Sequence, residues 1–152
     1  MPFNIDAGAK SILENLTTIL RSDATLKSLV NYDSKAPNIR RGYQTEGEWK
    51  TLLVYYFQPE LLMDNADFSP DFRVLPIIVN MWTKQNELVL YDIGERVIEL
   101  LDGQESALTK TGKNFVFNCA YDGALIELSV DAERKAYNRA LRFLVMFRKE
   151  TT

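Results

Sequence analysis

Residues 72–103, FRVLPIIVNMWTKQNELVLYDIGERVIELLDG, contain the change of pattern that decides the fold class. Residues 72–83 are rich in β-branched and aromatic side chains, which predicts a strand. After Asn86, a residue type that caps helices, small and apolar residues recur at helical spacing at positions 90, 93, 94, 97, 98 and 101. Asp102 and Gly103 predict the end of this helix, because glycine readily adopts the conformation that terminates helices. The stretch therefore predicts a strand followed by an amphipathic helix.

Two helical segments and two strands are expected before this stretch. Between residues 4 and 21 the apolar residues fall on one stripe of a helix, and Asn4 or Asp6 can cap its start. Asp23 is placed to cap a second, shorter helix that ends before Asn31. Strands are then expected at residues 38–43 and 49–57.

The C-terminal part shows the period-two pattern of antiparallel strands. Large side chains alternate along residues 115–121, and Asp122-Gly123 is the strongest short-range signal for a hairpin turn. Residues 124–130 are expected to form the return strand of this hairpin. In the last strand, at about residues 136–148, one face is expected to carry Tyr137, Leu141, Phe143, Val145 and Phe147.

This order of elements indicates an α+β fold. We expect a single domain over residues 1–152, in which a mainly antiparallel β-sheet packs against two or three helices, with a C-terminal hairpin and a long final strand. The composition agrees, since 46% of the residues are hydrophobic and 26% are charged. A chain of 152 residues can bury a core without disulfides or a structural metal.

The composition also excludes whole classes of function. The sequence has no histidine, which excludes histidine-based triads and most zinc sites, so we expect no metal and no cofactor. Lys and Arg number 18 against 21 Asp and Glu, and the net charge of −3 has the wrong sign for a protein that wraps nucleic acid. One cysteine indicates a reducing compartment. The sequence shows neither an 18-residue apolar run nor a secretory signal pattern, so no membrane partner is expected.

Two motifs resemble ligand sites, and both lack required residues. Residues 111–113, TGK, would suit a phosphate-binding loop, but Ala107 and Asn114 stand where the motif needs Gly and Ser or Thr. A calcium loop would use a trio of carboxylates, those of Asp64, Asp67 and Asp71. Ala66 and Phe68 occupy positions where such a loop needs oxygen ligands. We therefore expect solvated loops at both places.

Catalysis would have to use a carboxylate or the one thiol. Cys119 is expected on a strand face with Phe117 and Tyr121, where it packs as a small hydrophobic residue. A small enzyme could use Asp92 or Glu95 on the predicted helix, but no second catalytic residue can be named. The residues therefore favour a function without catalysis.

Basic residues gather in two places. One is Arg40-Arg41, and the other is the final strand with its preceding turn, which contributes Arg134, Lys135, Arg139, Arg142, Arg148 and Lys149. In an acidic protein these groups can contact phosphates, as a nucleic-acid-binding module would, or acidic residues of a neighbouring subunit.

The segment at residues 59–71 is unusually long for a connection in a compact domain. It carries the apolar residues Leu61, Leu62, Met63 and Phe68. They stand among four acidic residues, Glu60, Asp64, Asp67 and Asp71. A disordered loop rarely holds so many apolar residues, so we expect an arm that packs on a further surface, for example that of another subunit. The alternative is that it folds back over its own sheet.

Three stretches together resemble the tail terminator proteins of long-tailed phages, also called tail completion or tail-to-head joining proteins. They are the N-terminal helix running into LKSLV at residues 26–30, the strand and helix from VLPIIVN at 74–80 to IELLDG at 98–103, and YNRALRF at 137–143. The resemblance covers nearly the whole chain and lies in the pattern and order of elements. The segment at 59–71 is longer than is usual for the family.

The resemblance implies a non-enzymatic virion protein that forms a ring, most often a hexamer, at the head-proximal end of the tail tube. Such a ring stops tube polymerisation and binds the tail tube protein and the head completion or connector protein. Six copies at −3 each carry −18, so DNA would pass through an acidic lumen without specific binding. Contacts to subunits or the tube are expected at Leu62, Met63, Phe68 and Phe72, with Arg40, Arg41 and Trp49 as second choices.

The sequence leaves other roles in the virion open. A neck or head-completion protein that binds the portal side, or the terminator of a contractile tail, would also use a small α+β domain in a ring. The sequence does not separate these alternatives from the tail terminator.

Overall fold

The structure, a computed structural model, describes residues 7–58, 63–64 and 72–149. Its helices are α1 (Ala7–Ser22), α2 (Ala24–Val30), α3 (Leu88–Leu101) and α4 (Glu105–Leu108). Its strands are β1 (Ile39–Arg41), β2 (Thr51–Phe57), β3 (Met63–Asp64), β4 (Phe72–Thr83), β5 (Asn114–Asp131) and β6 (Ala136–Lys149). The expected caps Asn4 and Asp6 lie outside the described residues.

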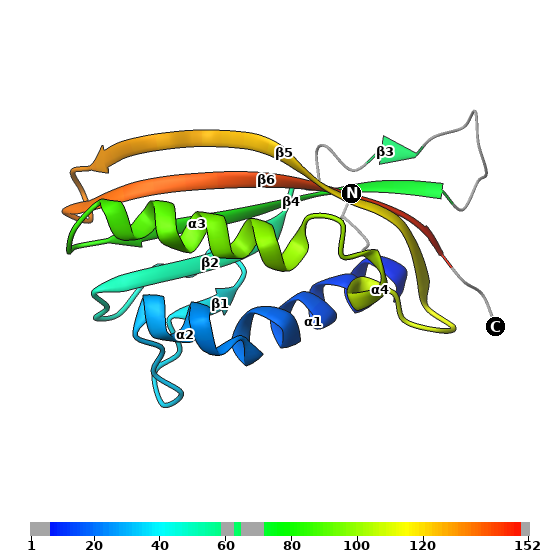
Figure 1. Ribbon diagram of the computed structural model, residues 1–152, viewed down its shortest axis with the longest axis horizontal. Helices are drawn as coiled ribbons and strands as arrows, with labels where there is room; N and C mark the ends of the chain where they lie inside the picture. Colours follow the sequence, from blue (N-terminus) through cyan, green and yellow to red (C-terminus); the bar gives the residue numbers. More distant parts are fainter. Residues whose placement is uncertain (1–6, 59–62, 65–71, 150–152) are drawn as a thin grey trace.

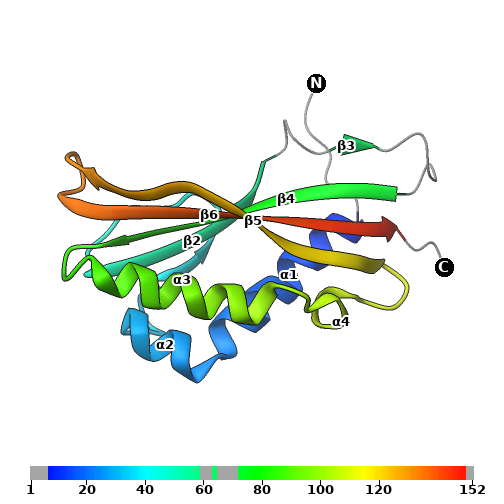
Figure 2. The same cartoon turned by 45° about the horizontal axis from the view of Figure 1, so that its top comes forward.

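One mixed sheet has the order β1-β2-β4-β6-β5, and β3 pairs with β4 beside this path. Only β1 and β2 are parallel; the other described pairs are antiparallel. All four helices lie on one face of the sheet (Figures 1 and 2). The α+β class, the mainly antiparallel sheet and the long final strand are therefore as the sequence predicts.

The main core lies between the helices and this face of the sheet. Alternate residues of β4 and β6 point into it, because side chains along a strand alternate between faces. The strand residues include Ile77, Val79, Met81, Leu141, Phe143, Val145 and Phe147. They pack against the apolar stripes of α1 and α3, such as Ile12 and Leu16 or Ile93 and Val97.

Asp23 joins α2 to α3. Its Oδ2 accepts a hydrogen bond of 2.8 Å from the Leu26 N–H and so caps α2, as the sequence predicts. The same carboxylate accepts two hydrogen bonds from the Arg96 guanidinium, at 2.6 and 2.9 Å. The hydrogen bonds from Arg96 hold the pKa of Asp23 below its usual value, although partial burial opposes this.

A buried arginine lies between α3 and β6. The Arg139 guanidinium is 4.7 Å from the centre of the Tyr91 ring and 4.0 Å from the Glu127 carboxylate. It occupies the space where a Cβ at position 94 would stand, which is why α3 carries Gly94 there. Gly94 therefore serves close packing, although glycine weakens a helix interior.

The hairpin lies at a different position from the one that Asp122-Gly123 predicts. Residues 114–131 form one long strand, and the turn to β6 lies at residues 132–135. Gly123, with φ of +107°, sits at one of four register shifts between β5 and β6. Its backbone freedom is used in a β-bulge, where positive φ is common for glycine. The prediction of a return strand at 124–130 is therefore wrong.

Three smaller predictions also change. Residues 104–113 are polar in sequence, which predicts a loop, but residues 105–108 form the short helix α4. The N-cap of α3 is Glu87, while the Asn86 side chain accepts a hydrogen bond from the Leu88 N–H. Phe117 lies on the exposed face of β5 and Cys119 on the buried one, because a register shift separates Val116 from Asn118.

Replacing Gly94 with Ala tests the packing of Arg139. We expect Gly94→Ala to lower the free energy of unfolding by about 1–3 kcal/mol in urea titrations, because the new methyl group displaces the guanidinium. In an Arg139→Ala background the same change should stabilise the protein by up to about 1 kcal/mol, since Ala forms helices better than Gly. An equal loss in both backgrounds would contradict this explanation.

Candidate assembly surface

β5 is an edge strand of the sheet, since β6 is the one strand that pairs with it in the described part of the chain. Eight large hydrophobic residues are exposed among the described residues, and five of them lie on this strand. They are Phe115, Phe117, Leu125, Leu128 and Val130. Exposed apolar side chains along a sheet edge are typical of a surface that binds another chain.

The first half of the β5 edge is covered within the molecule. The Gly103 N–H donates a hydrogen bond of 2.8 Å to the Cys119 carbonyl, and the Tyr121 N–H donates one of 2.9 Å to the Asp102 carboxylate. The segment between α3 and α4 thus occupies outward-facing backbone groups of β5. This part of the edge is not available to a further strand.

The second half of the edge, residues 123–131, carries no such cover from the described residues; we call it the distal edge. Leu125, Leu128 and Val130 are exposed there, with Val130 70% exposed. Glu127 is the charged residue among them, with 75% of its side chain exposed. The distal edge therefore combines strand geometry, apolar side chains and one exposed carboxylate, whose ion pair with the buried Arg139 is long, at 4.0 Å.

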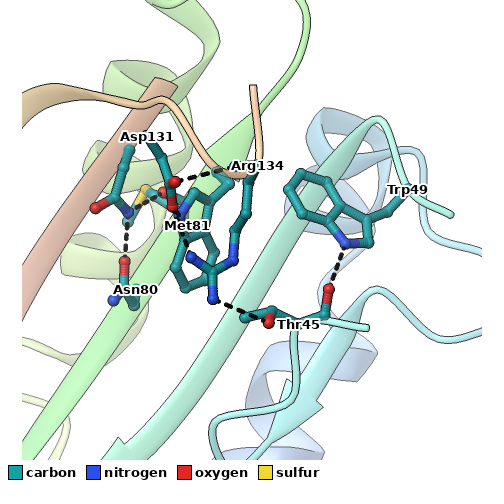
Figure 3. Close-up of polar contacts among 8 residues, drawn as sticks. Thr45, Trp49, Asn80, Met81, Asp131 and Arg134 are labelled. Carbon is teal, nitrogen blue, oxygen red and sulfur yellow. Dashed lines mark hydrogen bonds and ion pairs between the residues drawn. The ribbon is translucent and has the colours of Figure 1, made fainter. Parts of the chain in front are cut away.

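A cluster on the face without helices holds the end of this hairpin in place (Figure 3). The Trp82 indole N–H and the Arg134 guanidinium donate to the Asp131 carboxylate, at 3.1 and 2.8 Å. Arg134 also donates to the Thr45 hydroxyl at 3.2 Å, and the Trp49 indole donates to the Thr45 carbonyl at 2.9 Å. The loop before β2 and the β5–β6 turn are thereby fixed to the sheet.

Asn138 connects β6 to β4 beside this cluster. Its side-chain amide donates to the Asn80 side chain at 2.6 Å and to the Met81 carbonyl at 2.9 Å (Figure 3). Both asparagines are buried, so these hydrogen bonds replace the water that they would otherwise bind.

The structure brings Met63 and Phe72 together on the paired strands β3 and β4 and places the other described contact residues elsewhere. Met63 lies in β3 opposite Val74, and Phe72 begins β4 opposite Arg148. Trp49 is 9% exposed and belongs to the cluster of Figure 3. Leu62 and Phe68 lie outside the described residues, as does most of the expected arm at 59–71.

Arg40 and Arg41 lie at the opposite edge of the sheet, on β1. Arg40 donates hydrogen bonds to the carbonyls of Pro37, Gln44 and Glu46, at 2.6, 3.2 and 2.7 Å. Arg41 is exposed. Both line an open hollow of about 580 Å³ between α1 and β1.

The basic residues of the final strand do not form one patch. Arg142 donates to the Asp122 carboxylate at 2.7 Å, and Arg139 is buried beneath α3. Arg148 lies over the Phe115 ring at 5.5 Å and the Phe117 ring at 5.9 Å. These arginines are engaged by carboxylates and aromatic rings of their own chain, which does not favour phosphate binding along this strand.

The groups considered for catalysis do not come together in any of three hollows formed by described residues. Burial raises the pKa of the Cys119 thiol to about 12, with a further contribution from the nearby carboxylates of Glu105 and Asp102, so it stays protonated. Asp92 and Glu95 are exposed on α3, and neither lines any of three hollows formed by described residues.

The expected loop at 111–113 is a turn between α4 and β5. The Asn114 side chain, in the position that a phosphate loop gives to a magnesium ligand, is buried and hydrogen-bonds to Ser11 of α1. Asp64 lies in β3, while Asp67 and Asp71 fall outside the described residues.

Neither a metal site nor a membrane span is found in the part of the chain that the structure describes. Within residues 7–58, 63–64 and 72–149, no group of three or more Cys, Asp or Glu side chains is arranged to hold a metal ion. Over the same ranges, no helix has both the length and the apolar character needed to cross a membrane.

Neither a protein-family model nor a curated protein matches the sequence. Among solved structures, a chain in the virion of a native gene transfer agent particle superposes with a TM-score of 0.72. The likeness covers 93% of this chain and 98% of that chain, at 17% sequence identity. The two chains share one fold. In the gene transfer agent particle this fold belongs to a component of an assembled virion.

Acid should loosen the cluster of Figure 3. Burial alone would raise the pKa of Asp131, but hydrogen bonds from the Arg134 backbone, its guanidinium and the Trp82 indole hold the pKa below its usual value. A carboxyl with a depressed folded-state pKa stabilises the fold above its unfolded pKa, and that contribution is lost as the pH falls through the folded value.

Tryptophan fluorescence measures this effect directly, because both tryptophans of the chain, Trp49 and Trp82, lie in the cluster. We expect an emission change below about pH 4 that is absent from Asp131→Asn, whose spectrum already resembles the acid form at neutral pH. Asp92→Asn, at an exposed position on α3, is the control and should titrate like the unmodified chain. An identical acid transition in Asp131→Asn would contradict the assignment.

Proposed function

We propose that this chain is a structural virion protein, folded as a single domain, that forms a six-membered ring at the head-proximal end of a phage tail tube. The ring ends tube polymerisation and provides the surface that joins tail to head, without catalysis. The observation that supports this most is the likeness in fold, over 93% of the chain, to a component of a gene transfer agent virion.

The geometry of the sheet supports ring formation. A cyclic ring needs a surface on each subunit that binds a different surface on the next one. The distal edge supplies one such surface, because Leu125, Leu128 and Val130 are exposed along a strand with a free side. Association there buries apolar area and satisfies backbone groups at the same time.

A terminator needs a second surface, on which the ring meets the tube. We assign this role to the segment that holds Leu62, Met63, Phe68 and Phe72, which has more apolar residues than a solvated loop requires. We assign Arg41 to the contact between neighbouring subunits of the ring. Arg40 and Trp49 hold the loops beside it through hydrogen bonds to backbone carbonyls. The head completion or connector protein binds the opposite face of the ring, and DNA passes through a lumen without specific binding.

Electron microscopy of particles that lack the protein tests the role. A terminator predicts overlong tails that carry no heads, because tube subunits continue to add when the ring is absent. Normal-length tails detached from full heads would assign the protein to the neck instead, on the portal side. Infectious particles with normal tails would contradict both roles.

The distal edge can be tested with purified protein. We expect Leu128→Lys with Val130→Lys to abolish ring formation, alone and on tail tubes, because lysines on an edge strand oppose pairing with another chain. Thr25→Lys with Ser28→Lys, at exposed positions of α2, adds the same charge away from the edge and should leave assembly intact. Assembly by the edge variant, measured by sedimentation, would show that the distal edge is not the contact.

A further inference from the structure

The two edges of the sheet differ in charge. At the β1 edge, Arg21, Arg40 and Arg41 line the hollow of about 580 Å³, and Glu14 is the acidic residue that lines it with them. Arg21 and Arg40 donate hydrogen bonds to backbone carbonyls, which leave their positive charge uncompensated. Arg41 is exposed beside them. We call this surface the β1 socket.

The β5 side of the molecule has the opposite character. Glu127 is exposed on the distal edge, and Glu95 is exposed on α3, one helical turn beyond the Tyr91 that covers Arg139. Arg139, the partner of Glu127, is buried under the Tyr91 ring. Lys135 lies beside Val130 at the far end of the strand, where the two line a small hollow. The exposed surface around Glu127 is therefore apolar with a negative charge, away from that end.

We propose that the β1 socket receives the distal edge of a second copy of this chain, so that neighbouring subunits associate head to tail across opposite edges of their sheets. This inference rests on the proposed ring and names its two contacting surfaces. The argument for a second copy as the occupant is complementarity: the socket is lined by three arginines and one carboxylate, and the edge strand carries the exposed carboxylate of Glu127 among apolar side chains.

The position of the two surfaces sets the symmetry of the assembly. β1 and β5 lie at opposite ends of the strand order, so a contact between them uses different surfaces on the two partners. Contacts of this kind repeat from subunit to subunit and form a ring when the rotation between neighbours closes, whereas pairing of two β5 edges would stop at a dimer. The charges also orient each subunit before contact, because opposite charges steer association.

Charge reversal on each surface tests this contact. Arg41→Glu and Glu127→Arg are both at exposed positions, so each variant should fold normally by circular dichroism. In mass photometry, each variant alone should need at least about tenfold higher concentration to form rings, because it places like charges at every contact. Lys113→Glu, in the exposed turn before β5, is the matched control and should assemble like the unmodified chain.

The mixture of the two variants gives the decisive result. Each contact between an Arg41→Glu subunit and a Glu127→Arg subunit again joins opposite charges, so an equimolar mixture should form rings in which the two alternate. The inference is overturned if either variant alone assembles normally, or if the mixture fails while both variants are folded; the proposed ring then stands with other contacts. An unmodified chain that stays monomeric, even on tail tubes, overturns the ring and this inference together.

Discussion

β6 lies between β4 and β5 and pairs with both in antiparallel register over almost its whole length. This arrangement places Phe143, Val145 and Phe147 in the main core. It also leaves β5 with one side paired and the other side directed outward. The properties of the candidate assembly surface follow from this pairing. The backbone N–H and C=O groups on the unpaired side of β5 need hydrogen-bond partners other than a neighbouring strand.

Only part of this outer side of β5 receives hydrogen bonds from other described residues of the chain. Near Cys119 and Tyr121, the segment between α3 and α4 supplies a backbone N–H and a carboxylate to the strand. Beyond Gly123 the strand continues past this cover, and the contacts of Asp131 with Trp82 and Arg134 hold its far end against the sheet. The far end of the distal edge is thus held to the sheet by side-chain contacts, and order that exists before binding reduces the entropy lost when another chain binds. A terminator ring built from such subunits would have its lateral contact preformed.

Much of the fold could be predicted from the sequence, and the errors have local physical causes. β4 and β6 are bounded as predicted, since long runs of β-branched and aromatic residues have few alternatives, and Asp23 caps α2 as its position indicates. Asp122-Gly123 misled because a glycine with positive φ serves a bulge as well as a turn, and only the partner strand decides between them. A signal for the true turn was present in the charged run at 133–135 between two apolar strands.

The sequence did not predict the distal edge because of the same error: as a return strand, residues 124–130 would have had a neighbour on each side. Whether a strand is at the edge depends on the order of strands, which short-range patterns do not contain.

Hydrogen exchange of the β5 amides, before and after assembly, tests directly whether the free half of this strand is the surface that joins subunits. In the monomer, the amides of Cys119 and Tyr121 should be protected, because they lie where α3 and α4 cover the edge, and the outward-facing amides of 123–131 should exchange rapidly. Assembly should slow exchange in 123–131 by orders of magnitude and leave Cys119 and Tyr121 unchanged. Rapid exchange along 123–131 in the assembled ring would contradict the account.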